Sequence, residues 1–382
     1  MELKEYELGE LLPYEQPSAY IVESTDYNDS YKTPVLTAGK SFILGYTNET
    51  EGIFDKLPVI IFDDFTTATQ YVNFKFKVKS SAMKILNINT ELVLPKYIFY
   101  RMQTIQFDHS THKRYWIQQY SKIKVSIPPL PEQKRIVTHI EELFSELDKA
   151  VETLQTTKQQ LAVYRQAVLK EAFEGDCTWT HCNLGDVIEL LTDYHANGSY
   201  QVLKENVTLS DEPDYAIMIR STNFEKNDFK YDLKYINKHS YDFLKKSQLF
   251  GGEVLMGKIG NAGRVYYLRD LKRPVSLAMN MFAMRFSSNI ISKYVYYYLL
   301  SPEAEADIKH FVKGVGTPTI DKKSVRSLKF RYPNIESQQQ LIAKVESKLS
   351  LCESIEQTVD TALAQADAMR QSILKQAFEG GF

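Results

Sequence analysis

The sequence predicts a mixed α/β (α+β) protein in which two globular blocks alternate with two long helices. We expect the helices to pair as an antiparallel coiled coil with pseudo-twofold symmetry. Two observations lead to this fold class: a helical element that occurs twice, and short strand patterns in the block before each copy. The length of 382 residues also exceeds what one small core accommodates. We therefore divide the chain into residues 1–129, 130–176, 177–333 and 334–382.

The first observation is a duplication. Residues 120–176 align with residues 325–381 without a gap, which places Pro128 over Pro333 and Gln133 over Gln338. At the far end, RQAVLKEAFEG (165–175) lies over RQSILKQAFEG (370–380), with eight of eleven positions identical. Such agreement indicates that one element has been duplicated.

Each copy has the pattern of a long helix. Pro131 and Glu132 suit a first helical turn, while Gly175 and Gly380 suit a C-cap. Between these ends, apolar residues follow alternating steps of three and four, as in a heptad seam. The predicted seam residues are Ile140, Leu147, Leu154, Leu161 and Val168 in the first copy, and Val345, Ile355, Val359, Met369 and Ile373 in the second.

Each seam needs a partner. A helix of about forty residues spans roughly 60 Å, and the nearest stripe of matching length is the other copy. The alternative is that each helix packs only on its own block, but two complete heptad seams in one chain favour pairing.

The globular blocks have strand patterns. Residues 71–79 alternate strictly, so Phe74, Phe76 and Val78 should share one face and Lys75, Lys77 and Lys79 the other. Residues 57–64 also form a strand pattern, and residues 253–268 resemble two strands folded at residues 260–263. Residues 290–301 favour a short packed helix. Each block is therefore expected to be a mixed α/β or β-rich domain.

Motifs for small-molecule chemistry are incomplete. GEVLMGKI (252–259) approaches a phosphate-binding loop, but Ile259 stands where that motif needs a hydroxyl. The Asn- or Asp-Pro-Pro-aromatic signature of adenine methyltransferases does not occur. Cys177, His181 and Cys182 have no second ligand pair at zinc-like spacing. His109 and His112 lie in a polar stretch that favours a contact loop over a catalytic site.

Composition limits the remaining classes. The net charge of −2 gives no global attraction to nucleic acid, so binding of a polyanion would depend on local patches. Three cysteines fit a reducing, cytoplasmic location. No apolar run reaches the length of a membrane span, and the first residues lack the pattern of a signal peptide.

Local basic patches do occur in both blocks. Lysines and arginines recur beside strands and turns, together with asparagines and threonines that can donate to base edges. A solvated face would explain any one of these groups. Their recurrence, with glycines that allow close backbone approach at residues 260 and 263, favours contact with DNA.

The whole chain resembles the specificity subunits (HsdS) of type I restriction–modification systems. The resemblance is carried by the helix entrances PLPEQKRIV and NIESQQQLI, by TAGKSFILGYT, PVIIFDDFT and KSSAMKIL in the first block, and by GEVLMGKIGNAGR in the second. It implies a non-catalytic reader of double-stranded DNA, with one target-recognition domain for each half of a bipartite site. The helices would set the spacer between the half-sites.

The resemblance also implies partners. Two methyltransferase (HsdM-like) subunits would bind the helical core and carry AdoMet, whereas this chain would hold no cofactor. Motor-nuclease (HsdR-like) subunits, which use ATP and Mg²⁺, can join them. The predicted DNA contacts are Thr66, Thr67, Lys75, Lys77, Lys79, Lys113 and Arg114 in the first block, and Lys258, Asn261, Arg264, Asn280 and Thr317 in the second.

Three alternatives stay open on sequence alone. A lone methyltransferase or nuclease would need the cofactor motifs described above. A coiled-coil scaffold that binds proteins without DNA is compatible with the near-neutral charge. A recognition subunit of a different DNA-modification system would have much the same sequence pattern.

Overall fold

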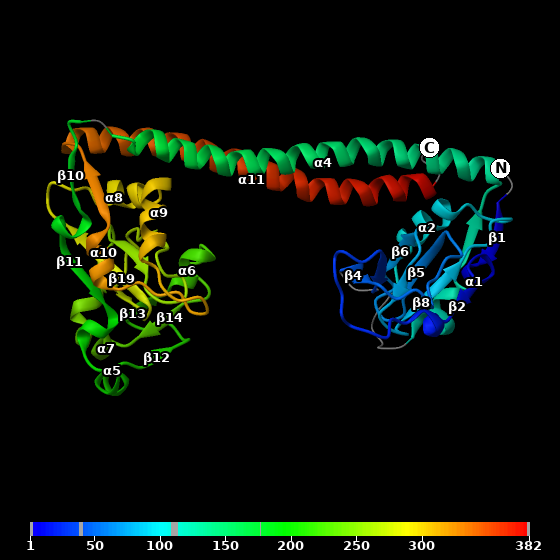
Figure 1. Cartoon of the computed structure of the whole chain (residues 1–382), viewed down its shortest axis with the longest axis horizontal. Coiled ribbons are helices and arrows are strands. Elements are labelled where there is room, and N and C mark those ends of the chain that lie inside the picture. The colour runs from blue at the N-terminus through cyan, green and yellow to red at the C-terminus, as the bar shows by residue number, and fades with distance from the viewer. Residues whose placement is uncertain (1–2, 38–40, 108–113, 176, 380–382) are drawn as a thin grey trace. The chain divides into compact units, whose positions relative to one another are not determined.

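The computed structural model describes residues 3–37, 41–107, 114–175 and 177–379. The chain divides into two compact units (Figure 1). Unit 1 comprises Met1–Gln155 and Asp360–Phe382, and unit 2 comprises Thr156–Val359. Two long helices, α4 (Leu130–Phe173) and α11 (Ile335–Phe378), each contribute one part to each unit. The predicted long helices are therefore confirmed.

The described residues of unit 1 form three sheets. Their strands, in order within each sheet, are β2 (Tyr14–Glu15), β8 (Met83–Asn87), β5 (Val59–Asp63) and β6 (Thr69–Val72); β4 (Ile43–Thr47), β3 (Thr33–Leu36) and β7 (Lys77–Val78); and the pair β1 (Lys4–Glu7) with β9 (Lys124–Ile127). The helices besides α4 and α11 are α1 (Leu8–Leu11), α2 (Pro95–Gln103) and α3 (Tyr115–Gln118).

Unit 2 repeats this plan with more strands and helices. Its sheets are β11 (Ile188–Asp193), β19 (Met281–Phe286), β16 (Val254–Gly257) and β17 (Val265–Tyr267); β12 (Leu209–Ser210), β14 (Lys234–Ile236), β13 (Ala216–Ile219), β18 (Val275–Leu277) and β15 (Gln248–Leu249); and the pair β10 (Thr180–Asn183) with β20 (Lys329–Tyr332). Its own helices are α5 (Tyr200–Asn206), α6 (Ser221–Glu225), α7 (Lys238–Phe243), α8 (Ser292–Leu299), α9 (Pro302–Phe311) and α10 (Lys322–Ser327).

The duplication extends to the topology of the blocks. In unit 1 β5 lies between β6 and β8, and in unit 2 β16 lies between β17 and β19, all antiparallel. In both units two strands also pair in parallel, β3 with β7 in unit 1 and β13 with β18 in unit 2. A short helix that follows the central sheet, α2 or α8, packs into the same apolar core as the adjoining part of α4 and α11. The predicted mixed α/β fold class is confirmed.

A buried glutamine fixes each helix entrance to its block. The Gln133 side chain accepts from the Leu94 N–H at 2.7 Å and donates to the Leu92 and Pro128 carbonyls at 3.0 and 2.9 Å. Gln338 makes the equivalent bonds to Ile291, Asn289 and Pro333, at 2.9, 3.0 and 3.0 Å. Both side chains are fully buried. The glutamine common to both helix entrances thus ties the helix to the loop before α2 or α8.

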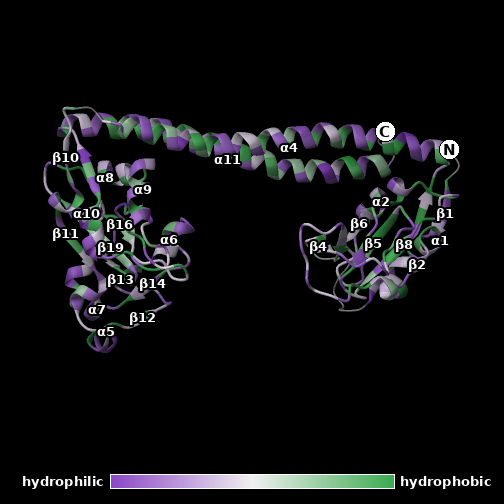
Figure 2. Ribbon diagram, in the orientation of Figure 1, coloured by the Kyte–Doolittle hydropathy of each residue, from purple (hydrophilic) through white to green (hydrophobic). Residues whose placement is uncertain are grey.

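Within each unit, α4 and α11 run antiparallel, and hydrophobic residues recur along both helices (Figure 2). In unit 1, Ile140 of α4 and Ile373 near the end of α11 belong to one apolar core. In unit 2 Leu169 shares a core with Val345. Glu171 accepts from Lys344 and Lys348 at 2.8 and 2.9 Å, and these hydrogen bonds lower the pKa of Glu171 to about 2.

The seam differs in part from its prediction. Six of the predicted residues are buried and Leu147 and Leu154 are half-buried, whereas Ile355 and Met369 are exposed, by 37% and 54%. The helix places Glu356 and Arg370 along the seam instead, where Arg165 pairs with Glu356 and Asp148 with Arg370. A spacing of three and four residues is compatible with residues on either side of the seam. The prediction took the apolar residues Ile355 and Met369, whereas the helix turns their polar neighbours toward the partner helix. The buried or half-buried predicted residues are Ile140, Leu147, Leu154, Leu161, Val168, Val345, Val359 and Ile373.

The single strand predicted over residues 71–79 is wrong. The chain leaves one sheet after β6 and enters another at β7, so the alternation serves two different sheets. Lys77 consequently does not share a solvated face with Lys75 and Lys79. Its ammonium is buried, 2.6 Å from a Glu49 carboxylate oxygen and 2.7 Å from the Glu51 carbonyl.

The other local predictions agree with the structure. Residues 57–64 contain β5, residues 253–268 form the hairpin β16–β17, and residues 290–301 contain α8. Gly175 has a φ of +71°, as expected after a helix C-terminus. The corresponding Gly380 lies outside the described residues.

Candidate nucleic-acid interface

Three loops of unit 2 meet at one end of the central sheet. The Gly260 N–H donates to the Pro318 carbonyl at 2.9 Å, and the Ile320 N–H donates to the Lys258 carbonyl at 3.0 Å. The Lys258 N–H donates in turn to the Asn280 carbonyl at 2.7 Å. We call residues 258–264, 279–280 and 313–322 the lysine edge. It brings together Lys258, Asn261, Asn280 and Thr317, which the sequence predicted separately, and Arg264 closes the same turn.

Glycines make the turn of this edge tight. A Cβ added to Gly257 would lie 2.0 Å from the Asn261 carbonyl oxygen, and one added to Gly263 would lie 2.4 Å from a methyl of Ile308. Neither position has room for a side chain. The turn therefore keeps one shape, with Lys258 and Asn261 on a fixed backbone.

Two lysines of the edge share one carboxylate. The Asp193 side chain, only 5% exposed at the end of β11, lies 2.7 Å from the Lys258 ammonium and 2.9 Å from that of Lys322. Burial raises the pKa of Asp193, but hydrogen bonds from the two lysines outweigh it and the pKa falls below its usual range. Two cations on one anion leave a local excess of positive charge.

The polar residues of the edge are held in different ways. The Asn261 amide donates to the Glu225 carboxylate of α6. Asn280 has a φ of +69°, and Arg264 and Thr317 are exposed. These side chains supply amide, hydroxyl and guanidinium groups, the donors that read base edges and bind phosphates.

Unit 1 has an equivalent edge. The Asp64 N–H donates to the Ala82 carbonyl, and the Tyr115 N–H donates to the Asp64 carbonyl at 3.0 Å, in the pattern described for Lys258. Thr66 and Thr67 form the β5–β6 turn beside these bonds. In unit 1 the lysine at this edge is not at the surface, because Lys84 and Asp64 form a buried ion pair at 3.3 Å. The two edges thus share these two backbone hydrogen bonds but differ in their side chains.

The other predicted contacts of unit 1 lie apart. Lys75 is exposed and lies 3.7 Å from Asp55, and Lys79 is exposed over the Tyr27 ring. Arg114 is exposed at the N-cap of α3. Lys113 lies outside the described residues. Lys77 is unsuited to a phosphate because its charge is paired inside the unit.

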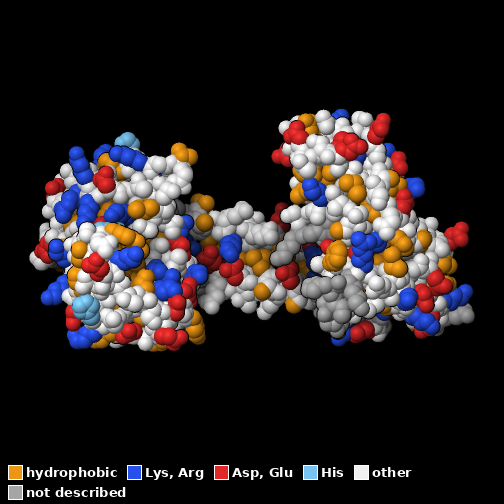
Figure 3. All heavy atoms as spheres, turned by 90° about the horizontal axis from the view of Figure 1, so that it is seen from below, with side chains coloured by type: hydrophobic (Ala, Val, Ile, Leu, Met, Phe, Trp, Pro, Cys, Tyr) orange, Lys and Arg blue, Asp and Glu red, His pale blue; other side chains and the backbone are white. Residues whose placement is uncertain are grey.

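Sequence reasoning missed two lysines of unit 2. Lys313 and Lys322 belong to the lysine edge but stand more than fifty residues after Lys258 in the chain. Only pairing of the loop with the β16–β17 turn brings them near it. Lysines and arginines are numerous on the face of unit 2 that Figure 3 shows at the left.

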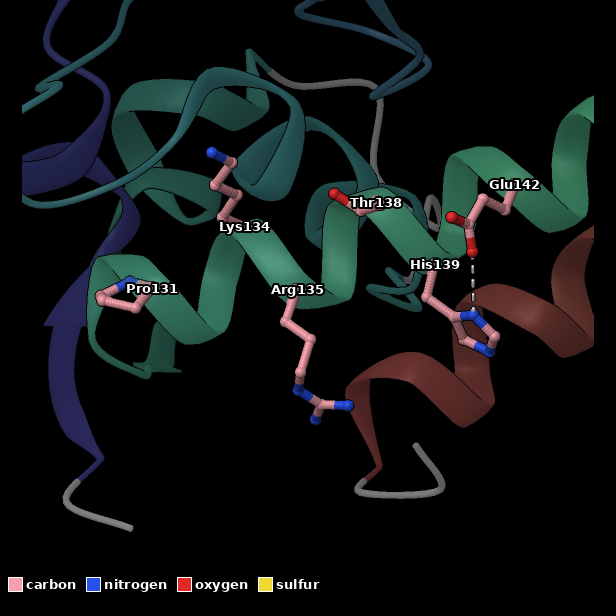
Figure 4. A pocket seen from close by; sticks show the side chains of 6 residues that line it. All are labelled: Pro131, Lys134, Arg135, Thr138, His139 and Glu142. Atoms are coloured by element: carbon pink, nitrogen blue, oxygen red, sulfur yellow. Dashed lines mark ion pairs between the residues drawn. The ribbon is translucent and has the colours of Figure 1, made fainter.

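One hollow of the described residues lies on the first turns of α4. The hollow in Figure 4 is lined by Pro131, Lys134, Arg135, Thr138, His139 and Glu142, all from α4. Lys134 points away from Arg135 and His139, and His139 faces Glu142 at 3.7 Å. Among the described residues, no three His, Cys, Asp or Glu side chains come together as metal ligands.

Comparison with known proteins decides the family. A family model described as the type I restriction modification DNA specificity domain matches residues 1–161 and again residues 177–365. The chain is 33% identical over 379 residues to the EcoR124I/EcoR124II specificity subunit of Escherichia coli, covering 91% of this chain and 87% of that protein. This chain belongs to the type I restriction–modification specificity subunits. It is therefore a non-catalytic subunit that recognises DNA.

Other specificity subunits agree. The EcoBI specificity subunit of Escherichia coli is 25% identical over 281 residues, covering 66% of this chain and 57% of that subunit. A chain solved in a study of complex assembly and conformational transition in a type I system matches with a TM-score of 0.69 at 16% identity, covering 98% of this chain and 99% of that one.

The HsdS subunit of Thermoanaerobacter tengcongensis matches with a TM-score of 0.52 at 17% identity, covering 100% of this chain and 97% of that one. At these identities the two solved structures bear on the fold alone. In the part of this specificity subunit that the structure describes, every helix is too short or too polar to span a bilayer.

Proposed function

We propose that unit 1 and unit 2 of this specificity subunit each read one half of a bipartite, gapped DNA site in the cytoplasm. The observation that carries the proposal is that the family model matches twice, once over each copy. Each copy has the same hairpin edge with different side chains, as expected if the two half-sites differ in sequence.

The lysine edge supports a division of labour in unit 2. Lysines bind phosphates and fix the position of the protein on the duplex, whereas asparagine and threonine can read bases. Lys258 and Lys322 keep their excess charge at the surface because Asp193 neutralises only one of them. In unit 1, Thr66, Thr67, Lys75, Lys79 and Arg114 remain candidates, and so does Lys113.

The paired helices would set the spacer and bind two methyltransferase subunits. Apolar side chains are exposed on both helices of unit 2, and a partner subunit that covered them would remove their apolar surface from water. They are Val163, Tyr164, Leu351 and Ile355. The partner methyltransferases would carry AdoMet and methylate adenine, and partner motor-nuclease subunits would use ATP and Mg²⁺.

A genome-wide methylation map of the source organism, with the gene intact and deleted, tests this function. Deletion should remove methylation from one gapped adenine motif and reveal both half-sites at once. If the methylome is unchanged although the three-subunit methyltransferase is expressed, the proposal is wrong. The alternative would then be a protein-binding scaffold. A complex that shows no salt-dependent binding to DNA would favour that alternative.

A further inference from the structure

The loop between α9 and α10, orange in Figure 1, is closed by backbone hydrogen bonds. Lys313 and Thr319 exchange two backbone hydrogen bonds, of 2.9 and 2.8 Å, which close a hairpin. The hairpin base is fixed to the β16–β17 turn through Pro318 and Ile320, and Ile320 is buried. The tip therefore stands on the sheet as part of the lysine edge.

Val315 is at that tip, and its side chain is fully exposed. Gly314 precedes it with a φ of +95°, and a Cβ added there would lie 2.7 Å from the Thr317 carbonyl oxygen. Gly316 follows it. The Val315 side chain adds no hydrophobic stabilisation to the fold, because its apolar surface stays in water.

Two further apolar side chains project from the neighbouring turns. Ile259 is 38% exposed and Met279 is 49% exposed. Lys258 and Lys322 lie at the same edge, so the apolar side chains have cations beside them. Apolar side chains flanked by cations are complementary to the major groove of DNA. There, phosphates flank the base edges, and the thymine 5-methyl is an exposed apolar group.

We propose that Val315 contacts the 5-methyl group of a thymine in the second half-site, and so specifies an A·T pair there. The inference rests on the proposed function of unit 2. It adds a specificity-determining residue of a kind that charge and hydrogen-bonding patterns in the sequence did not point to.

The test replaces thymine by deoxyuridine, one position at a time, in a duplex that carries the motif found by methylation mapping. This exchange removes one methyl group and nothing else. The assembled complex of this chain with its methyltransferase subunits should lose about fourfold in affinity at one position of the second half-site. With Val315→Ala, the loss at that position should disappear.

Lys313→Ala is the matched control from the same loop. It should weaken binding to every duplex and reduce the salt slope by about 1, while the complex still discriminates uracil from thymine. If wild type binds its motif but tolerates uracil everywhere, or if Val315→Ala keeps the full uracil effect, the inference is wrong and the proposed function stands. A complex that shows no motif preference would overturn both.

Discussion

At the scale of single residues, the two copies make equivalent hydrogen bonds and ion pairs although many of their residues differ. Gln133 and Gln338 make the same three hydrogen bonds, and Lys96–Glu141 in unit 1 corresponds to Lys293–Glu346 in unit 2. The buried amides matter more than the ion pairs, because exposed ion pairs contribute little and an unpaired buried carbonyl costs much. The helix entrance thus depends on one glutamine in each copy.

We expect Gln133→Ala and Gln338→Ala each to lower the free energy of unfolding by about 1–3 kcal/mol, because each leaves buried backbone groups without partners. Urea unfolding of the purified chain measures this loss. Gln339→Ala is the matched control, since Gln339 is exposed and should change stability by less than about 0.5 kcal/mol. Equal effects at Gln338 and Gln339 would contradict the role of the buried amide.

Asp193→Asn should also destabilise the chain, by about 1–2 kcal/mol at neutral pH, because it removes the charge shared by Lys258 and Lys322. The lysines are partly exposed and can turn to water, which limits the loss.

The effect of Asp193→Asn should depend on pH. The pKa of Asp193 is lowered in the folded state, so its stabilisation is present above the ordinary value of 3.8 and is lost as pH falls through the lower, folded pKa. Unfolding curves at several pH values should show wild type and variant converging below pH 3.8. A constant difference down to the acid limit would mean that the carboxylate charge is not the cause.

At the scale of elements, the two long helices combine a buried seam with apolar residues that the seam leaves outside. The polar flank of the seam carries interhelical ion pairs, and the Arg370 guanidinium lies over the Phe144 ring, 4.4 Å from the ring centroid. A planar guanidinium can cover an aromatic face in this way while it also pairs with a carboxylate. The apolar flank is therefore left available to a partner.

Substitutions on the two flanks should separate folding from assembly. Val345→Gln and Val359→Gln replace buried side chains and should each cost about 2 kcal/mol or more in urea unfolding. Ile355→Gln and Met369→Gln should cost less than about 0.5 kcal/mol and should reduce co-purification of a tagged methyltransferase subunit. Normal co-purification with both exposed-flank variants would exclude these positions from the docking surface.

At the scale of the whole molecule, duplication explains the organisation of the chain. Both units repeat one topology, and each long helix belongs to both of them. An α-helix rises by a constant distance per residue. If the helix pair separates two DNA-binding units, the length of the helices would set the number of base pairs between the half-sites. The spacer of the recognised motif should therefore depend on the helices and not on the blocks.

Inserting one heptad into each helix at the same level of the pair should widen the spacer by about three base pairs. Seven residues add about 10 Å of helix, and a base pair rises 3.4 Å. Methylation mapping of a strain with the lengthened gene reads the new spacer directly, and both half-sites should stay the same. An unchanged spacer would refute the role of the helices as a ruler.

Elements that depend on local periodicity could be predicted from the amino-acid sequence alone. The long helices, the β16–β17 hairpin and the duplication all follow from the spacing of residues along the sequence. That spacing does not depend on which segments pack together. The sequence also indicated Lys258, Asn261 and Asn280, because they stand beside turns.

Which side chains are paired, buried or exposed depends instead on contacts between distant segments of the chain. Lys77 is buried because β7 belongs to a different sheet from β6. Ile355 and Met369 lie outside the seam because the antiparallel partner covers the other flank. Lys322 meets Asp193, and Val315 stands at the lysine edge, through contacts between segments far apart in the chain. Periodicity describes one segment at a time, whereas these outcomes depend on which segments pack together.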